Sequence, residues 1–333
     1  MHQFFRTIRR SLGVPACPAD QALPTQRRVY QNCLRFIQMF YAANLYLSVE
    51  RLSKWSRWSE WTGDQVFAPV WPVAWMNVVD LPSAAISILL ANLAAALLAT
   101  ALPGVRLFRV LAAITLLQAG ALDGSFGKIS HGDHMWLWTL IGLIFVPDRS
   151  PTGPPSDRLE RQRTLEVVWA IQFILLMFYS MSGALKLLPV PFQAMAGQPT
   201  AFSSEALARH IADRLLQTGS SSLIGDFFIR HTWLGWPLFV GGLYLECFSL
   251  FVAFRPGAHR LWGLGLISLH IGIALTMNIW FTRNILLLAL LFVNSPFAPA
   301  GIPLWTQVAQ LPLIRLAIRV SGRSAAGQRR STA

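Results

Sequence analysis

Long apolar stretches, separated by short polar segments, follow one another along most of the chain. Many approach the roughly 20 residues that a helix needs to cross the ~30 Å hydrocarbon core of a bilayer. The pattern therefore predicts an all-α fold, a polytopic bundle of transmembrane helices with short interfacial helices. The eight expected spans cover approximately residues 29–50, 82–102, 106–123, 132–147, 165–187, 234–254, 260–279 and 283–299.

The two ends of the chain differ from this central region. Residues 1–28 are basic and predict an amphipathic segment on the cytoplasmic leaflet. Residues 29–300 form the expected transmembrane domain. Residues 301–333 predict an interfacial helix, over 304–320, followed by a basic cytoplasmic tail.

Three tryptophans recur at every third position after the first predicted span: Trp55, Trp58 and Trp61. They predict a tryptophan face on an outer interfacial helix. This face either anchors the chain at the membrane surface or forms a lid over a lipid-soluble ligand.

Composition agrees with a membrane protein, because 54% of the residues are hydrophobic and only 13% are charged, against about 25% charged in soluble domains. The net charge of +13 could indicate nucleic acid, but the charges gather between apolar runs, as topology signals do, so no nucleic-acid partner is expected. One set of loops holds 18 basic residues and the other holds 9. By the positive-inside rule, we expect a multi-pass protein of the cell inner membrane with both termini in the cytoplasm.

Lys186 ends the fifth predicted span and is one of only three lysines, with Lys54 and Lys128. Unlike arginine, lysine can lose its proton when it is desolvated. Tyr179, Gly183 and Lys186 are spaced at i, i+4 and i+7 and share a helix face. Lys186 is therefore either a general base or a side chain that reaches to the membrane surface, and Gly183 allows close approach of a helix or a flat ligand.

Two other polar residues lie within predicted spans. An intramembrane carboxylate such as Glu246 is expected to face the bundle interior and to have a partner, with Lys186, His270 and Arg35 as candidates. His270 either handles a proton or makes an interhelical hydrogen bond. Asn278 follows at the outer turn.

His131 and His134 open the fourth predicted span, next to Trp136 and Trp138. They lack a third metal ligand nearby, and the three cysteines form no cluster, so no metal site is expected. His134 is either catalytic or part of an interfacial His-Trp cap.

Several of these segments together resemble one family: the vitamin K-dependent γ-glutamyl carboxylases and their bacterial relatives that share the HTTM (horizontally transferred transmembrane) domain. The resemblance covers about residues 125–300, in the family's order. The matching segments are 133–138, 179–187, 241–246, 277–278 and 295–297.

The resemblance implies that Lys186 is the base that deprotonates a reduced quinone, vitamin K hydroquinone or a menaquinol-like molecule, and that His134 lies in the same active site. Oxygen then turns the quinol anion into a stronger base, and carbon dioxide adds to a substrate carbanion. Glu246 and His270 join this catalytic set. The residues expected to bind the quinone are Tyr179, Gly183, Asn278 and Trp138.

The substrate expected from the resemblance is a small secreted peptide, or another small molecule, handled at the extracytoplasmic face with help from a partner subunit. The chain departs from the carboxylases in having Pro189–Phe192 after the lysine, where they have a tryptophan, and in ending soon after the last span. Two other functions fit the same pattern: a DoxX-like, quinone-linked redox subunit, and a non-catalytic membrane protein that binds a peptide for maturation or immunity.

Overall fold

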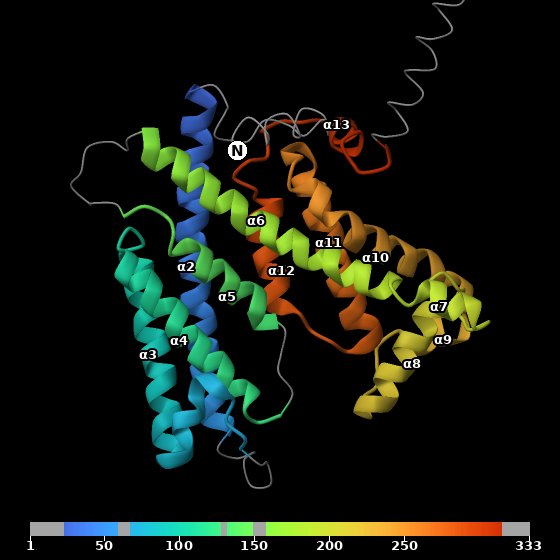
Figure 1. Ribbon diagram of the computed structural model, residues 1–333, viewed down its shortest axis with the longest axis horizontal. Coiled ribbons are helices and arrows are strands. Elements are labelled where there is room, and N and C mark those ends of the chain that lie inside the picture. The colour runs from blue at the N-terminus through green and yellow to red at the C-terminus, as the bar shows by residue number, and fades with distance from the viewer. Residues whose placement is uncertain (1–22, 59–66, 128–131, 149–157, 315–333) are drawn as a thin grey trace, which may run out of the picture. The chain divides into compact units, whose positions relative to one another are not determined.

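The structure, a computed structural model, describes residues 23–58, 67–127, 132–148 and 158–314. Of these residues 78% are helical and none forms a strand, which confirms the predicted all-α fold (Figure 1). Five helices in the described part are long and apolar enough to cross a membrane. They are α3 (Leu81–Ala101), α4 (Arg106–Gly124), the stretch Arg158–Met195, α10 (Thr232–Val252) and the stretch Pro256–Met277.

The other three predicted spans also coincide with helices. Residues 29–50 lie within α2 (Leu23–Trp58), a 36-residue helix that carries many polar side chains. The fourth span corresponds to the 12-residue α5 (Gly132–Leu143), and the eighth to α12 (Thr282–Leu288) with a π-helix at Ala289–Val293. Because these helices are less apolar or shorter, their crossing of the membrane stays a prediction.

The chain divides into two compact units at Ile171 and Gln172, within helix α6 (Arg158–Leu187). In the unit before this point, α2 packs on α3, α3 on α4, and α4 on α5. Helix α3 begins where Asp80 accepts a hydrogen bond from the Ser83 backbone nitrogen at 3.1 Å. This carboxylate satisfies one of the free amide groups of the first turn.

A buried arginine ties the same unit together. The Arg51 side chain is 5% exposed and lies 3.0 Å from Asp123 and 2.8 Å from Asp133. Nearby, the Trp136 ring stacks on Phe40 at 4.7 Å, and its indole nitrogen donates to Asn44. The unit therefore combines an aromatic core with a charge cluster. Removing one member of this cluster would leave another charge without compensation.

The second unit contains the end of α6, three short helices, and helices α10 and α11 (His259–Met277). The short helices are α7 (Val190–Met195), α8 (Ala206–Thr218) and α9 (Gly225–Arg230). Helix α10 packs on both α8 and α11. Helix α8 ends because Gly219 adopts a left-handed conformation, with φ of 59°.

The helix predicted over 304–320 is found only at the start of its described part. Helix α13 covers only Leu304–Val308, and the chain then turns at Pro312, which has no backbone donor, and at Leu313, whose φ is 64°. Residues 315–320 lie outside the described residues, as do 1–22 and the tail.

The tryptophan face is described only at its first position. Trp55 is in the last turns of α2, and its ring lies 6.2 Å from that of Phe126 within the same unit. The Trp58 side chain, Trp61 and His131 lie outside what the structure describes. The predicted anchor or lid thus stays a prediction.

Candidate functional site

Lys186 and Glu246 form an ion pair between α6 and α10. The Lys186 Nζ atom lies 2.6 Å from each carboxylate oxygen of Glu246, and the Ser182 hydroxyl donates to the same group at 3.3 Å. The Glu246 side chain is 8% exposed, whereas that of Lys186 is 40% exposed. Of the three partners expected for Glu246, the structure selects Lys186, and the buried member of the pair is the carboxylate.

Gly183 allows the two helices to come this close. A Cβ atom at this position would lie 2.7 Å from the backbone nitrogen and the Sγ atom of Cys247, and 3.0 Å from the Cβ atom of Glu246. Contacts this short do not occur between unstrained atoms. Of the two roles expected for Gly183, close approach of a helix is therefore the one seen here.

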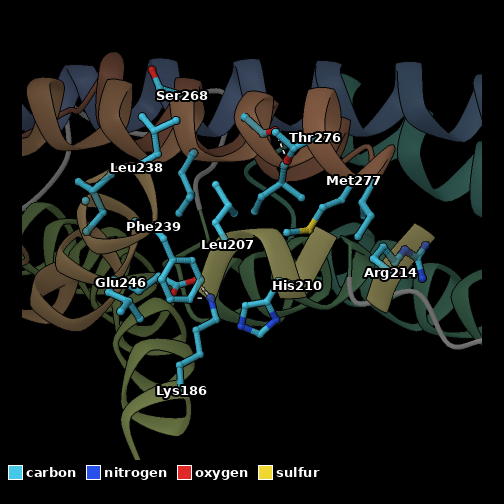
Figure 2. A pocket seen from close by; sticks show the side chains of 18 of the residues that line it. Lys186, Leu207, His210, Arg214, Leu238, Phe239, Glu246, Ser268, Thr276 and Met277 are labelled. Atoms are coloured by element: carbon cyan, nitrogen blue, oxygen red, sulfur yellow. Dashed lines mark hydrogen bonds and ion pairs between the residues drawn. The ribbon is translucent and has the colours of Figure 1, made fainter. Parts of the chain in front are cut away.

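A cavity of about 710 Å³ lies beside the ion pair. Lys186 and Glu246 form part of its wall, together with residues of α8, α10 and α11 (Figure 2). Most of the remaining wall is apolar, with Leu238, Leu269 and Ile273 among its members. A ligand there would meet a mainly apolar surface with an ionised pair on one side.

Glycines on the facing helices leave room in this cavity. A Cβ atom added to Gly241 of α10 or to Gly272 of α11 would meet no atom within 4 Å. Larger residues at these positions would project into space that is now open. The volume of the cavity thus depends directly on the sequence of α10 and α11.

His210 on α8 belongs to this site and was not among the predicted residues. Its ring stacks on Phe239 at 5.3 Å, and burial together with the ammonium of Lys186 lowers the pKa of His210. Helix α8 lies in residues 188–233, which the sequence indicates only as a connection. The signal that could have found it is the amphipathic spacing of Leu207, His210 and Arg214 on one helix face.

Tyr179 and His270 form a second buried pair. The Tyr179 hydroxyl lies 2.7 Å from His270 Nε2, and the other ring nitrogen of His270 is buried without a hydrogen-bond partner in the described part of the chain. This agrees with the interhelical hydrogen bond expected for His270. Neither residue lines the cavity.

The remaining predicted residues are less directly placed. Asn278 adopts a left-handed conformation, with φ of 53°, at the end of α11, and its neighbours Met277 and Ile279 line the cavity. His134 and Trp138 lie on α5, in the other unit, so their closeness to Lys186 stays a prediction. Among the described residues, no three His, Cys, Asp or Glu side chains gather as a metal site would require.

Comparison of the chain with family models, with curated proteins and with solved structures found no match.

Proposed function

We propose that this protein is an integral membrane enzyme that binds a reduced quinone in the cavity and takes a proton from it at the Lys186–Glu246 pair. The observation that carries the proposal is a buried carboxylate, held 2.6 Å from an ammonium group, in the wall of a mainly apolar cavity. Ionisable groups at membrane depth are costly and are typically functional.

The cavity suits a lipid-soluble ring. Its volume of about 710 Å³ lies within the ~300–1,000 Å³ typical of small-molecule sites. Leu238, Leu269 and Ile273 offer apolar contacts, and Gly241 and Gly272 leave space for a flat group. A reduced quinone would supply acidic hydroxyl groups and two electrons.

The two members of the pair have different parts in proton transfer. In the ion pair, Glu246 is the proton acceptor, and Lys186 carries the positive charge. When the carboxylate receives a hydroxyl proton, the Lys186 ammonium offsets the negative charge left on the ligand oxygen, so that the net charge of the site is unchanged. The base expected at Lys186 thus becomes a two-residue unit, and the exposed lysine side chain has the freedom to follow the charge.

The wider reaction enters the proposal through the sequence resemblance to the HTTM and γ-glutamyl carboxylase family. In that reaction, oxygen and carbon dioxide are co-substrates. A small peptide is modified at the extracytoplasmic face with the help of a partner subunit. The resemblance also implies proton handling by His134 and His270 and ring contact by Tyr179, Asn278 and Trp138. None of these five residues lines the cavity, so their roles rest on the sequence resemblance alone.

The test is quinol consumption by the purified full chain in lipid nanodiscs, with menaquinol and oxygen. Lys186→Met and Glu246→Gln should each lower turnover by roughly 10²- to 10⁴-fold, the range typical of a lost acid–base group. A matched control exists, because Lys54 and Glu50 form an exposed ion pair, also at 2.6 Å, on α2. Lys54→Met should leave turnover unchanged.

Equal turnover in Lys186→Met, Glu246→Gln and the unchanged protein would exclude the pair as the base. Turnover that requires an added flavin- or haem-containing subunit would favour the DoxX-like redox subunit. Binding of a peptide without any quinol turnover would favour the non-catalytic protein.

A further inference from the structure

Arg214 is a second cation in the wall of the same cavity. It lies on α8, and its Nε atom is buried with no hydrogen-bond partner among the described residues. No described carboxylate forms an ion pair with it. The Arg214 residue is partly buried. Because a guanidinium has five N–H donors and is always charged, a ligand with acidic oxygens in the cavity would meet a charged donor that no described carboxylate already neutralises.

The position of Arg214 separates it from the proton-transfer pair. Figure 2 shows Lys186 and Glu246 on one side of His210, and Arg214 on the other side, near Met277. Because Lys186 is already neutralised by Glu246, Arg214 is, among the described residues that line the cavity, the cation left available to a ligand.

The surroundings of Arg214 define what it would bind. Between it and the ion pair, the wall is mainly apolar and includes Leu207 and Met277. His210 does not compete as a cation, because its lowered pKa keeps the ring neutral near pH 7. Asp213 also lines the cavity and would weaken the attraction for an anion.

We infer that Arg214 binds the acidic group of an amphiphile, a carboxylate or phosphate attached to an apolar chain, with the chain lying in the cavity along α10 and α11. The guanidinium pairs with two oxygens of such a group, and the apolar wall removes the chain from water. The inference concerns the cavity of the proposed function, but it does not depend on proton transfer at the Lys186–Glu246 pair.

The experiment is native mass spectrometry of the full chain in neutral detergent at pH 8, with three probes. Dodecanoate carries both the charge and the chain, dodecanol only the chain, and acetate only the charge. Dodecanoate should bind roughly 10- to 100-fold more tightly than dodecanol, as expected for a charge-assisted hydrogen bond, and acetate should not bind measurably.

Variants of α8 test the residue itself. Arg214→Gln should remove the preference for dodecanoate, Arg214→Lys should keep part of it, and Asp213→Asn should strengthen it. Arg209→Gln is the matched control, since Arg209 lies on the same helix but does not line the cavity. If Arg214→Gln does not fold, the graded Arg214→Lys and Asp213→Asn variants still decide the matter.

Three results would overturn the inference: equal binding of dodecanol and dodecanoate, equal loss in Arg209→Gln and Arg214→Gln, or acetate binding as tight as that of dodecanoate. Dilauroyl phosphatidylglycerol is tested as a separate probe, because a lipid phosphate offers the guanidinium the same chemistry as a free fatty acid. Whichever of the two probes binds more tightly identifies the acidic group that Arg214 recognises. Quinol turnover measured in Arg214→Gln keeps the two proposals apart, because loss of dodecanoate binding with turnover retained concerns Arg214 alone.

Discussion

Replacing Gly183 by alanine tests whether the contact between α6 and α10 is as tight as the structure indicates. The new Cβ atom would lie 2.7 Å from the backbone nitrogen of Cys247, whereas ordinary contact begins at 3.4 Å, so the helices would have to separate by about 0.7 Å. The cysteine sulfur can rotate away, but the backbone nitrogen cannot. Separation of the helices is therefore the expected response.

The magnitude follows from two opposing terms. Overpacking of a close contact costs about 1–3 kcal/mol, while alanine in place of glycine inside a helix gains about 0.5–1 kcal/mol. Gly241→Ala gives the second term alone, because a Cβ atom there meets nothing within 4 Å. The free energy of unfolding of Gly183→Ala should therefore lie about 1–3 kcal/mol below that of Gly241→Ala.

The assay is reversible unfolding of both variants in mixed micelles, with increasing SDS and helical circular dichroism as the signal. Quinol turnover, measured on the same preparations, should fall in Gly183→Ala because the separation pulls Lys186 away from Glu246. Equal unfolding free energies for the two alanine variants would refute the reasoning, since they would mean that α6 and α10 are not in contact at Gly183.

Three further changes have defined outcomes. Arg51→Met leaves two carboxylates without their cation and should lower the free energy of unfolding by about 3 kcal/mol, as measured by SDS titration. Gly272→Leu fills open space in the cavity, so a quinone analogue should bind at least about 10-fold more weakly, by fluorescence quenching, while stability is kept. The folded protein holds the pKa of His210 below its ordinary 6.5, so protonation of this ring favours unfolding. The contribution of His210 to the free energy of unfolding is therefore full above about pH 6.5 and falls as the pH drops below it. His210→Gln should flatten this fall when the free energy of unfolding is measured between pH 7.5 and 5.

Each of these three predictions has a measurable result that would contradict it. A stable Arg51→Met variant would mean that Asp133 does not need its partner. Unchanged analogue binding in Gly272→Leu would place the ligand elsewhere, and an identical pH profile in His210→Gln would assign the acid sensitivity to another group.

The apolar runs of the sequence predict helix positions well because burial in lipid and helix formation impose the same pattern. The span predicted at 82–102 is found at Leu81–Ala101, between the Asp80 cap and a turn at Pro103 and Gly104. The fold class follows in the same way. The helix predicted over 304–320 is found only at Leu304–Val308. The amphipathic pattern continues past this point, but it carries no information on the left-handed conformation of Leu313, which a continuous helix cannot contain.

The candidate site was only partly predictable. Lys186 and Glu246 could each be identified as costly residues in a span, but their pairing joins positions 60 residues apart, and the pairing of helices is set by packing that no local pattern specifies. His210 and Arg214 were missed for a different reason. Their helix has 13 residues, too few to cross a bilayer, so no apolar run of spanning length marks it in the sequence.

The pairing of Lys186 with Glu246 also bears on how the chain enters the membrane during synthesis. An ionised side chain near the centre of a helix adds about 2.5–3.5 kcal/mol to the cost of its transfer from the translocon into lipid. Ribosomes make α6 before α10, so the cation is already present when Glu246 emerges. Helix α10 can thus leave the translocon against α6 with its charge neutralised, and a chain that lacked α6 would present the insertion machinery with a much poorer membrane segment.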